Sequence, residues 1–137
     1  MKPLQGIRVL EFARVLAGPM AGQILAELGA EVIKIEHPKF GDESRIFEPE
    51  WQDGESAYFT MFNRGKRSIT LNLKTPEGQK VARELAATAD VLTENFLPGR
   101  MEKLGLGPKQ LREINPKLVY VSSTGFGQDG PDAQRPG

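Results

Sequence analysis

The sequence predicts an α/β fold in which helices flank a mostly parallel β-sheet. Two observations carry this prediction: about five strand-like segments alternate with helix-like segments, and residues 6–36 form a strand, a helix and a strand in succession. The connection in such a unit is right-handed. With 137 residues, 39% of them hydrophobic, the chain is long enough for one domain with its own core.

The first strand is predicted over Ile7–Phe12, where bulky apolar residues indicate burial on both faces of a sheet. A turn at Ala17-Gly18-Pro19 follows, because Gly18 permits a tight backbone and Pro19 suits the first position of a helix. Close helix packing is the alternative role for Gly18. In an open α/β sheet we expect this turn to lie beside a ligand crevice.

The helix after this turn is predicted to be amphipathic, with Gln23 and Glu27 off its apolar face. The apolar stripe consists of Met20, Ile24 and Leu28, with Ala21 and Leu25 beside them. Gly29 is the expected C-terminal stop of the helix. Val32–Glu36 is then predicted as the second strand, which completes the unit.

The middle of the chain is less regular. Residues 37–54 mix proline, glycine and charges without a steady period, so they are predicted as a long loop that acts as a lid or an interface segment. Tyr58–Phe62 fits either a helical turn or a buried anchor. Residues 63–67 form a basic turn, and Ser68–Leu73 is predicted as a strand because apolar and polar residues alternate.

The next helix has three consecutive start signals, Thr75, Pro76 and Glu77, and is predicted to run to about Thr88. Its predicted inner face holds Val81, Leu85, Ala82, Ala86 and Ala89. Asp90–Glu94 is then expected to form a short buried strand. This helix should therefore pack on the sheet.

The last third of the chain again alternates predicted helices with a predicted strand. Pro98 and Pro108 are each expected to open a short helix, and the second of these should end at Asn115-Pro116 before a strand at Leu118–Ser122. A glycine-rich loop, Thr124–Pro131, either lines an oxyanion site with its N–H groups or only requires positive φ angles. Because the chain stops in loop chemistry just after it, we expect residues 1–137 to belong to a longer protein.

Composition bounds the possible partners. The formal net charge of +0 gives no electrostatic footprint for nucleic acid. No apolar run approaches the roughly 20 residues that span a bilayer, so no membrane partner is expected. The sequence contains no cysteine, which fits a reducing compartment, and we expect a cytoplasmic protein.

Ten short motifs follow one another along the chain. They are L-x-G-x-R-V-L-E from Leu4, A-G-P from Ala17, G-A-E-V-I-K-I-E from Gly29, G-D from Gly41, N-R-G-K-R-S from Asn63, L-N-L-K from Leu71, A-D-V-L-T-E-N-F-x-P-G from Ala89, L-G-L from Leu104, N-P-K-L-V-Y from Asn115 and G-F-G-Q-D-G-P from Gly125. Their order resembles that of the class III CoA-transferases, a family that includes formyl-CoA and carnitine CoA-transferases and the α-methylacyl-CoA racemases.

This resemblance covers essentially the whole chain and implies the N-terminal, CoA-binding portion of a Rossmann-like large domain, in an enzyme that is an interlocked homodimer. Family transferases move CoA from an acyl-CoA donor to a carboxylic acid through a covalent aspartyl intermediate, and no metal is implied. The nucleophilic aspartate of the transferases and the catalytic histidine of the racemases both fall beyond Gly137. No catalytic residue is therefore assigned within residues 1–137.

The resemblance also implies contacts with coenzyme A. The implied positions are Val15, Leu16, His37, Leu71, Asn72, Leu73, Lys74, Asn95, Phe96, Arg100 and Lys103. Such a set suits CoA, which needs cations for its phosphates and an apolar slot for adenine. His37 and Lys103 stand where arginine is common, and Leu16 replaces the glutamine of the formyl-CoA enzymes.

Each of these positions has a purely structural alternative. In any α/β sheet Leu71, Leu73 and Phe96 would be core residues, the lysines and Arg100 would be solvated, and His37 would be an exposed loop residue. Competing functions are an α-methylacyl-CoA racemase, a dinucleotide-binding module, and an inactive CoA-binding remnant. Glu36 lies where a dinucleotide fold places its ribose-binding acid, but G-x-G-x-x-G is lacking. The stretch from Asp42 to Phe62 is similar to the transferases, which favours a transferase.

Overall fold

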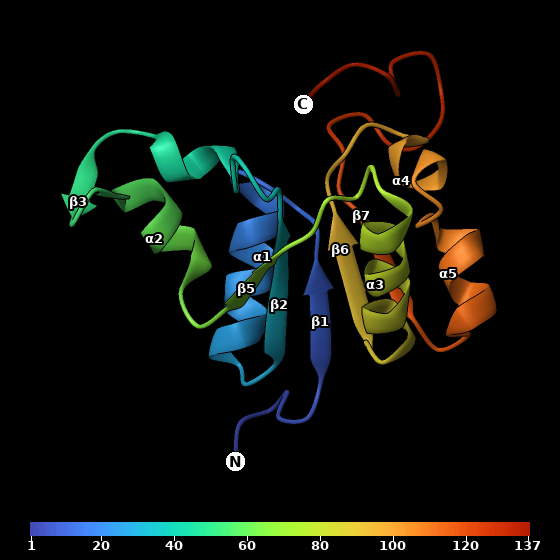
Figure 1. The fold of residues 1–137 in the computed structure, drawn as a ribbon, viewed down its shortest axis with the longest axis horizontal. Coiled ribbons are helices and arrows are strands. Elements are labelled where there is room, and N and C mark those ends of the chain that lie inside the picture. The colour runs from blue at the N-terminus through green and yellow to red at the C-terminus, as the bar shows by residue number, and fades with distance from the viewer.

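Five parallel strands form one sheet in the order β5-β2-β1-β6-β7 (Figure 1). The computed structural model describes the backbone of residues 1–137 and all side chains except those of residues 51 and 52. The strands are β1 (Arg8–Glu11), β2 (Glu31–Glu36), β5 (Arg67–Thr70), β6 (Val91–Glu94) and β7 (Val119–Ser122). The predicted α/β class and parallel sheet are confirmed.

The strand order places a topological switch at the centre of the sheet. From β1 the chain moves outward to β2 and β5, then crosses back to β6 and continues outward to β7. After β1 the chain continues toward β2, and after β6 it continues toward β7, on the opposite side of the sheet. The loops that follow these two neighbouring strands therefore diverge. Open α/β sheets bind ligands in the crevice that this separation leaves.

Helices cover both faces of the sheet (Figure 1). On one face, α1 (Ala17–Glu27) lies over a small core that contains Val9 and Val32. On the other face, α3 (Pro76–Ala87), α4 (Arg100–Lys103) and α5 (Pro108–Ile114) cover the larger core. That core includes Leu10, Phe12, Ala82, Leu92, Leu106 and Leu111. Among the described residues, no helix is long and apolar enough to cross a membrane.

Helix α1 packs on the sheet largely through small residues. Of the predicted apolar stripe, Leu25 packs against the small core, but Met20, Ile24 and Leu28 do not face it. Met20, Ile24 and Leu28 are 41–49% exposed, whereas Gly18 and Gly22 are buried. A side chain at Gly18 would collide with Ala13, and one at Gly22 would collide with the Glu11 carboxylate. At Gly18 and Gly22 the helix lies so close to the sheet that only glycine fits, which confirms the packing role considered for Gly18. Farther along the helix, Leu25 and Ala26 pack against the small core.

The predicted C-terminal end of α1 is confirmed, but its predicted start is wrong. The helix begins at Ala17, so Ala17-Gly18-Pro19 is its first turn and not the turn before it. The connection from β1 is instead made by Phe12 to Leu16. Gly29 ends the helix as predicted, with a φ of +107°.

The stretch predicted as a long loop contains short elements of its own. They are the 3-10 helix η1 (Glu43–Ile46) and the hairpin of β3 (Glu50–Gln52) and β4 (Glu55–Ser56). The apolar patch that fitted two interpretations is helical, within α2 (Ala57–Asn63), and Ser56 caps it by accepting a hydrogen bond from the Phe59 N–H. In Figure 1 this segment extends to the side of the sheet beyond β5.

Two further predictions need correction in the second half of the chain. Strand β5 ends at Thr70, so Leu71 and Leu73 follow the strand and do not belong to it. Helix α3 starts at the predicted cap, where the Thr75 hydroxyl accepts a hydrogen bond from the Gly78 N–H. Its buried residues are Gly78, Ala82 and Ala86, a row spaced by four, and Val81 is exposed because it lies off that row.

Candidate functional site

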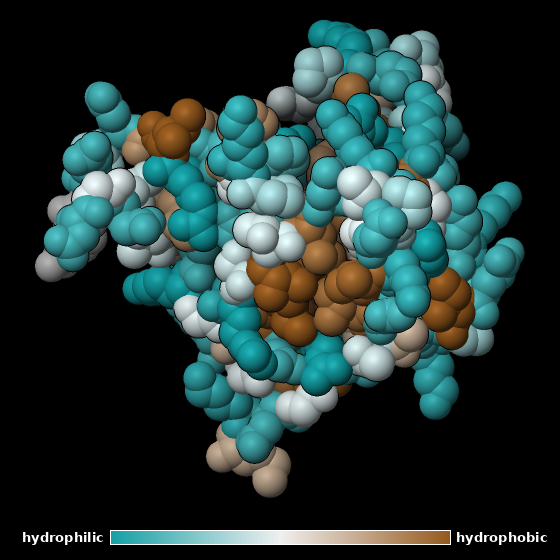
Figure 2. Space-filling model, viewed as in Figure 1, coloured by the Kyte–Doolittle hydropathy of each residue, from teal (hydrophilic) through white to brown (hydrophobic). Residues whose placement is uncertain are grey.

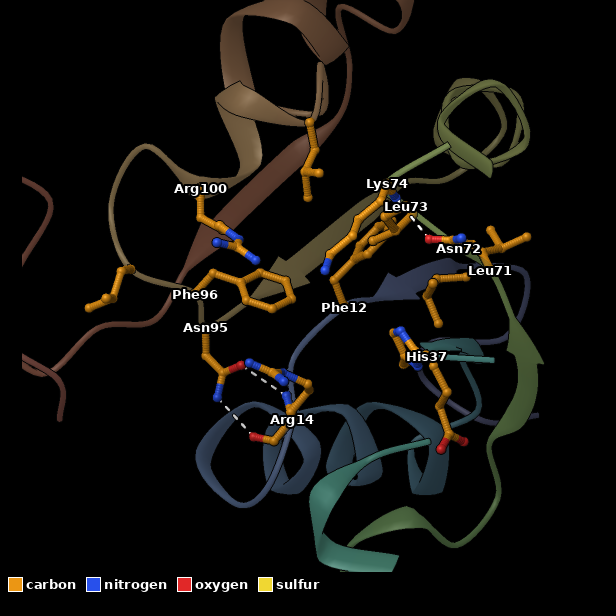
Figure 3. Close-up of a pocket in the computed structure, with 14 residues that line it drawn as sticks. Phe12, Arg14, His37, Leu71, Asn72, Leu73, Lys74, Asn95, Phe96 and Arg100 are labelled. Atoms are coloured by element: carbon orange, nitrogen blue, oxygen red, sulfur yellow. Dashed lines mark hydrogen bonds between the residues drawn. The ribbon is translucent and has the colours of Figure 1, made fainter. Parts of the chain in front are cut away.

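A cavity of about 440 Å³ opens where the parallel strands end at their carboxyl edge. Its lining comes from the segments that directly follow β1, β2, β5 and β6, which are distant in sequence and adjacent in the sheet. The lining residues are Phe12, Arg14, Ile35, Glu36, His37, Leu71, Asn72, Leu73, Lys74, Asn95, Phe96, Leu97, Arg100 and Leu104 (Figure 3). This is the crevice that the topology predicts.

Most of the site residues implied by the sequence meet at this cavity. Eight of them line it: His37, Leu71, Asn72, Leu73, Lys74, Asn95, Phe96 and Arg100. Val15 and Leu16 line a second cavity that adjoins the first, and Lys103 lines neither of the two. The sequence reasoning missed the other six lining residues, which are Phe12, Arg14, Ile35, Glu36, Leu97 and Leu104. All of them except Leu104 lie near the carboxyl end of a predicted strand.

The walls of the first cavity are largely apolar. Phe12 is fully buried beneath it, and Phe96, Leu71 and Leu73 are partly buried and pack against the larger core. Figure 2 shows apolar side chains at the surface between β5 and α3, surrounded by hydrophilic ones. The core interpretation of Leu71, Leu73 and Phe96 is thus confirmed, and the same side chains also line a cavity.

Cations reach into this apolar space. Lys74 and Arg100 both point into the cavity in Figure 3. Among the side chains that the structure describes, neither forms an ion pair with a carboxylate. The charges of both side chains are therefore free to meet an anion.

His37 is exposed, as its structural alternative predicted, but it lines the cavity. The ring stacks on Phe40 with 4.9 Å between ring centroids. The His37 Nδ1 accepts a hydrogen bond from the Lys39 N–H at 3.1 Å. Only Nε2 of the imidazole is then left to contact a ligand.

Arg14 lies between the two cavities and lines both. Its guanidinium lies 4.8 Å from the centroid of the Phe96 ring and forms an ion pair of 2.6 Å with Glu43. Its backbone is held from both sides by one side chain: Asn95 Oδ1 accepts from the Arg14 N–H at 2.8 Å, and Asn95 Nδ2 donates to the Arg14 carbonyl at 2.8 Å (Figure 3). Asn95 is therefore committed to positioning this loop.

The second cavity, of about 650 Å³, lies beside the start of α1. It shares Arg14, Asn95, Phe96 and Leu97 with the first. Val15, Leu16 and Ala17 line it on one side, and the glycine-rich loop contributes Thr124 and Gly125 on the other. The crevice expected beside Ala17-Gly18-Pro19 is thus present.

Glu36 lines the first cavity, but its carboxylate is already occupied. Arg45 binds both carboxylate oxygens, at 2.7 and 2.8 Å, while Ser68 and the Asp42 N–H donate to the same group. Burial alone would raise the pKa of Glu36, but Arg45 and Ser68 outweigh it and hold the pKa below its usual range. A ribose hydroxyl would have to displace these partners.

A buried charge network underlies the loop after β1. Lys34 Nζ lies 3.1 Å from Glu11 Oε1 and 2.8 Å from Asp42 Oδ2, and all three side chains are at most 1% exposed. Lys66 Nζ joins the network at 2.8 Å from Glu11 Oε1. Burial lowers the pKa of Lys66, although Glu11 opposes the shift. Burial would raise the pKa of Asp42, but Lys34 and Ser44 hold it below its usual range.

Comparison with known proteins places the chain among one group of enzymes. Residues 4–137 match the family model of CoA-transferase family III. Succinyl-CoA:glutarate CoA-transferase from Homo sapiens is 48% identical over 137 residues, which cover 100% of this chain and 31% of the relative. Succinate--glutarate CoA-transferase from Agrobacterium fabrum is 56% identical, with 96% of this chain and 34% of the relative covered.

A solved structure agrees with these sequence matches. A CAIB/BAIF family protein from Brucella suis superposes with a TM-score of 0.93 at 50% identity, over 99% of this chain and 37% of that protein. The chain thus spans about a third of the length of the relatives that it matches.

Proposed function

Because the chain belongs to CoA-transferase family III, we propose that residues 1–137 form the N-terminal, CoA-binding portion of a longer enzyme that moves CoA from an acyl-CoA donor to a carboxylic acid. The observation that carries this proposal is the first cavity, where eight implied CoA contacts from separate segments meet. Several relatives are named for succinyl-CoA and for dicarboxylic acids such as glutarate and L-malate, which supports a dicarboxylic acceptor.

The chemistry of the cavity supports CoA as its ligand. Leu71, Leu73 and Phe96 offer an apolar slot for adenine, while Lys74 and Arg100 offer charge to the diphosphate and the 3'-phosphate. Arg14 adds a third cation at the junction with the second cavity, where its guanidinium is paired with Glu43. The pantetheine arm would then run from the first cavity toward the second.

The mechanism implied by the family is covalent. An aspartate attacks the acyl-CoA thioester and displaces CoA thiolate, which gives a mixed anhydride. The thiolate then attacks the aspartyl carbonyl, which releases the donor acid and leaves an aspartyl-CoA thioester. The acceptor acid displaces the thiolate again to form a second anhydride, and attack of the thiolate on the acceptor's acyl carbon gives the new acyl-CoA and frees the aspartate. We propose that this aspartate lies outside residues 1–137, in a cytoplasmic homodimer whose chains interlock. Asp42 is unsuited to the role because its carboxylate is buried and paired with Lys34.

Two alternative functions fit the chain less well than a CoA-transferase. A racemase fragment would share the CoA site, but the stretch from Asp42 to Phe62 is similar to the transferases, and it is fully present here as η1, β3, β4 and most of α2. A dinucleotide-binding module is disfavoured because the Glu36 carboxylate is held by Arg45 and Ser68.

Calorimetric titration with CoA, dephospho-CoA and NADH tests the proposed ligand. We expect CoA to bind, dephospho-CoA to bind more weakly because a phosphate contact is lost, and NADH not to compete with CoA. NADH binding as tightly as CoA would favour the dinucleotide module instead. An absence of heat with CoA, confirmed by equilibrium dialysis, would reject the proposal.

A further inference from the structure

We infer that Asp42 is a positioning residue for the ligand site, because its buried carboxylate holds the loop between β1 and α1 in a conformation that the loop would not adopt alone. The inference rests on the proposed function only for the identity of the ligand. The position of the loop itself can be tested without any ligand.

The loop contains a strained residue. Val15 has a φ of +67°, in the left-handed region that glycine favours and that β-branched residues rarely adopt. No glycine relieves this strain at the position itself. Val15 and its neighbours Arg14 and Leu16 line the second cavity. The backbone conformation of Val15 therefore determines how this part of the cavity wall is placed.

Contacts with Asp42 hold Val15 in this strained conformation. The two carboxylate oxygens of Asp42 lie 3.2 and 3.3 Å from the Val15 nitrogen and accept the hydrogen bond of its N–H. Oδ1 also accepts hydrogen bonds from the N–H and the hydroxyl of Ser44, at 2.9 and 2.7 Å. Lys34 fixes the carboxylate from the other side at 2.8 Å. Because Asp42 is 1% exposed, water does not compete for these bonds.

The same loop is held at each neighbouring residue. Lys34 Nζ donates to the Ala13 carbonyl at 2.9 Å, and Asn95 pairs with both backbone groups of Arg14. Side chains from three separate segments therefore bind the backbone of three consecutive residues. Ala13 is bound from β2, Arg14 from the segment after β6, and Val15 from the segment after β2. A buried ion pair is weak evidence for a stabilising role, whereas this arrangement points to a role in fixing geometry.

The test compares Asp42→Ala, Val15→Gly and the double variant. Asp42→Ala should raise the hydrogen-exchange rate of the Val15 amide and weaken CoA binding, each by about tenfold or more, because the amide loses a charged acceptor. Val15→Gly removes a side chain that lines the second cavity, so it serves as the reference for the double variant. Because glycine adopts the same φ without strain, adding Asp42→Ala to Val15→Gly should lower the CoA affinity by less than about threefold.

This smaller loss in the Val15→Gly background distinguishes positioning from a general loss of structure, which a glycine at residue 15 would not repair. Ser44→Ala is the matched control, because it removes a hydrogen bond from the same carboxylate and leaves the Val15 contact in place. Its CoA affinity should stay within about twofold of the wild type. Four donor groups share the Asp42 carboxylate: the Val15 N–H, the N–H and hydroxyl of Ser44, and Lys34 Nζ. Asp42→Asn keeps the shape but replaces one acceptor oxygen by an NH2 group, so it should change both readouts in the same direction and serves if Asp42→Ala does not fold.

An unchanged Val15 exchange rate in the Asp42 variants would overturn the inference, and so would an Asp42→Ala substitution that costs as much CoA affinity in the Val15→Gly background as in the wild type. If the wild type binds no CoA, the proposed function fails, but the exchange rate of the Val15 amide still decides whether Asp42 positions the loop.

Discussion

Lys74 and Lys103 carry the same charge in different surroundings. Lys74 reaches into the first cavity, whereas Lys103, the last residue of α4, lines neither cavity. We expect Lys74→Gln to weaken CoA binding by on the order of 1.5 to 3 kcal/mol, because a phosphate loses a charged partner, and Lys103→Gln to have a smaller effect. Calorimetry with CoA measures both.

Lys109→Gln is the control for these substitutions, since Lys109 is exposed on α5 and lines neither cavity. It should leave the affinity unchanged. A Lys74→Gln variant that binds CoA as tightly as this control would remove Lys74 from the site.

The missed cavity residues show what motif matching leaves out. Phe12 and Arg14 follow β1 directly, and Glu36 ends β2, so the rule that crevices lie at the carboxyl ends of parallel strands would have found all three. Glu36 was considered only as a ribose-binding acid. Its pairing with Arg45 could not be predicted, because the two side chains meet only once the stretch after β2 has folded back.

Glu94 offers a test of stability against pH. Burial raises the pKa of Glu94 above its ordinary value of 4.5, so the folded state favours the neutral acid. That contribution to stability is fully present below pH 4.5 and is lost as pH rises through the raised pKa of the folded state. Glu94→Gln should therefore increase the free energy of unfolding at pH 7 and change it little near pH 4, as measured by urea denaturation.

Glu102→Gln is the matched control, because Glu102 is exposed and contributes only a secondary repulsion to Glu94. Glu102→Gln should change the pH dependence of the free energy of unfolding only slightly. If Glu94→Gln lowers stability equally at both pH values, the hydrogen bond that Glu94 accepts from the Phe96 N–H matters more than the cost of burying the charge.

Helix α1 shows how a pattern of apolar residues can mislead. Met20, Ile24 and Leu28 have ideal helical spacing, yet the side facing the sheet carries Gly18 and Gly22, also spaced by four. The spacing of the two glycines was visible in the sequence. Its meaning depends on the distance between helix and sheet, which is set by Ala13 and Glu11 on the neighbouring strand and loop.

Substitution of Gly22 by alanine tests this close packing. In an ordinary helix Gly→Ala increases stability by roughly 0.5 to 1 kcal/mol, since alanine favours the helix. Here the added Cβ meets the buried Glu11 carboxylate, which is also bound by Lys34 and Lys66, so we expect a loss of about 1 to 3 kcal/mol from overpacking. Urea denaturation gives the sign, and a stabilised variant would contradict the packing described here.

Met20→Ala provides the comparison on the exposed side of the same helix. Its side chain is 47% exposed, so truncation should cost less than about 1 kcal/mol. The identity of the elements was thus predictable from local patterns, as at Thr75 and Pro108. The buried face was predictable for α3, where Ala82, Ala86 and Ala89 are buried as expected. It was not predictable for α1, because there it depends on the surface opposite the helix.

Across the whole molecule, apolar side chains remain exposed at places far apart in the fold. Met20 and Ile24 lie on α1, and Val119 and Val121 lie on β7, the last strand at one edge of the sheet. Relatives are about three times longer than the chain. The resemblance predicted a portion of a longer enzyme, and the family match and the length of the relatives agree with that interpretation.

We expect residues 1–137 to bind CoA without turning over acyl-CoA. Binding requires the first cavity, an opening of about 440 Å³ that residues of this chain line. Turnover requires a nucleophile that is free to attack, and Asp42 is held by Lys34, Ser44 and the Val15 N–H. Without a covalent intermediate the rate should not exceed that of the uncatalysed reaction.

The measurement is transfer from succinyl-CoA to glutarate by the purified chain, beside the same assay on a full-length relative, with mass spectrometry to detect any covalent CoA adduct. The full-length relative should show both turnover and an adduct. Because binding and chemistry depend on different groups, calorimetry should still detect CoA in the chain that fails to react. Turnover above background, or an adduct on any residue up to Gly137, would place the catalytic group inside this chain.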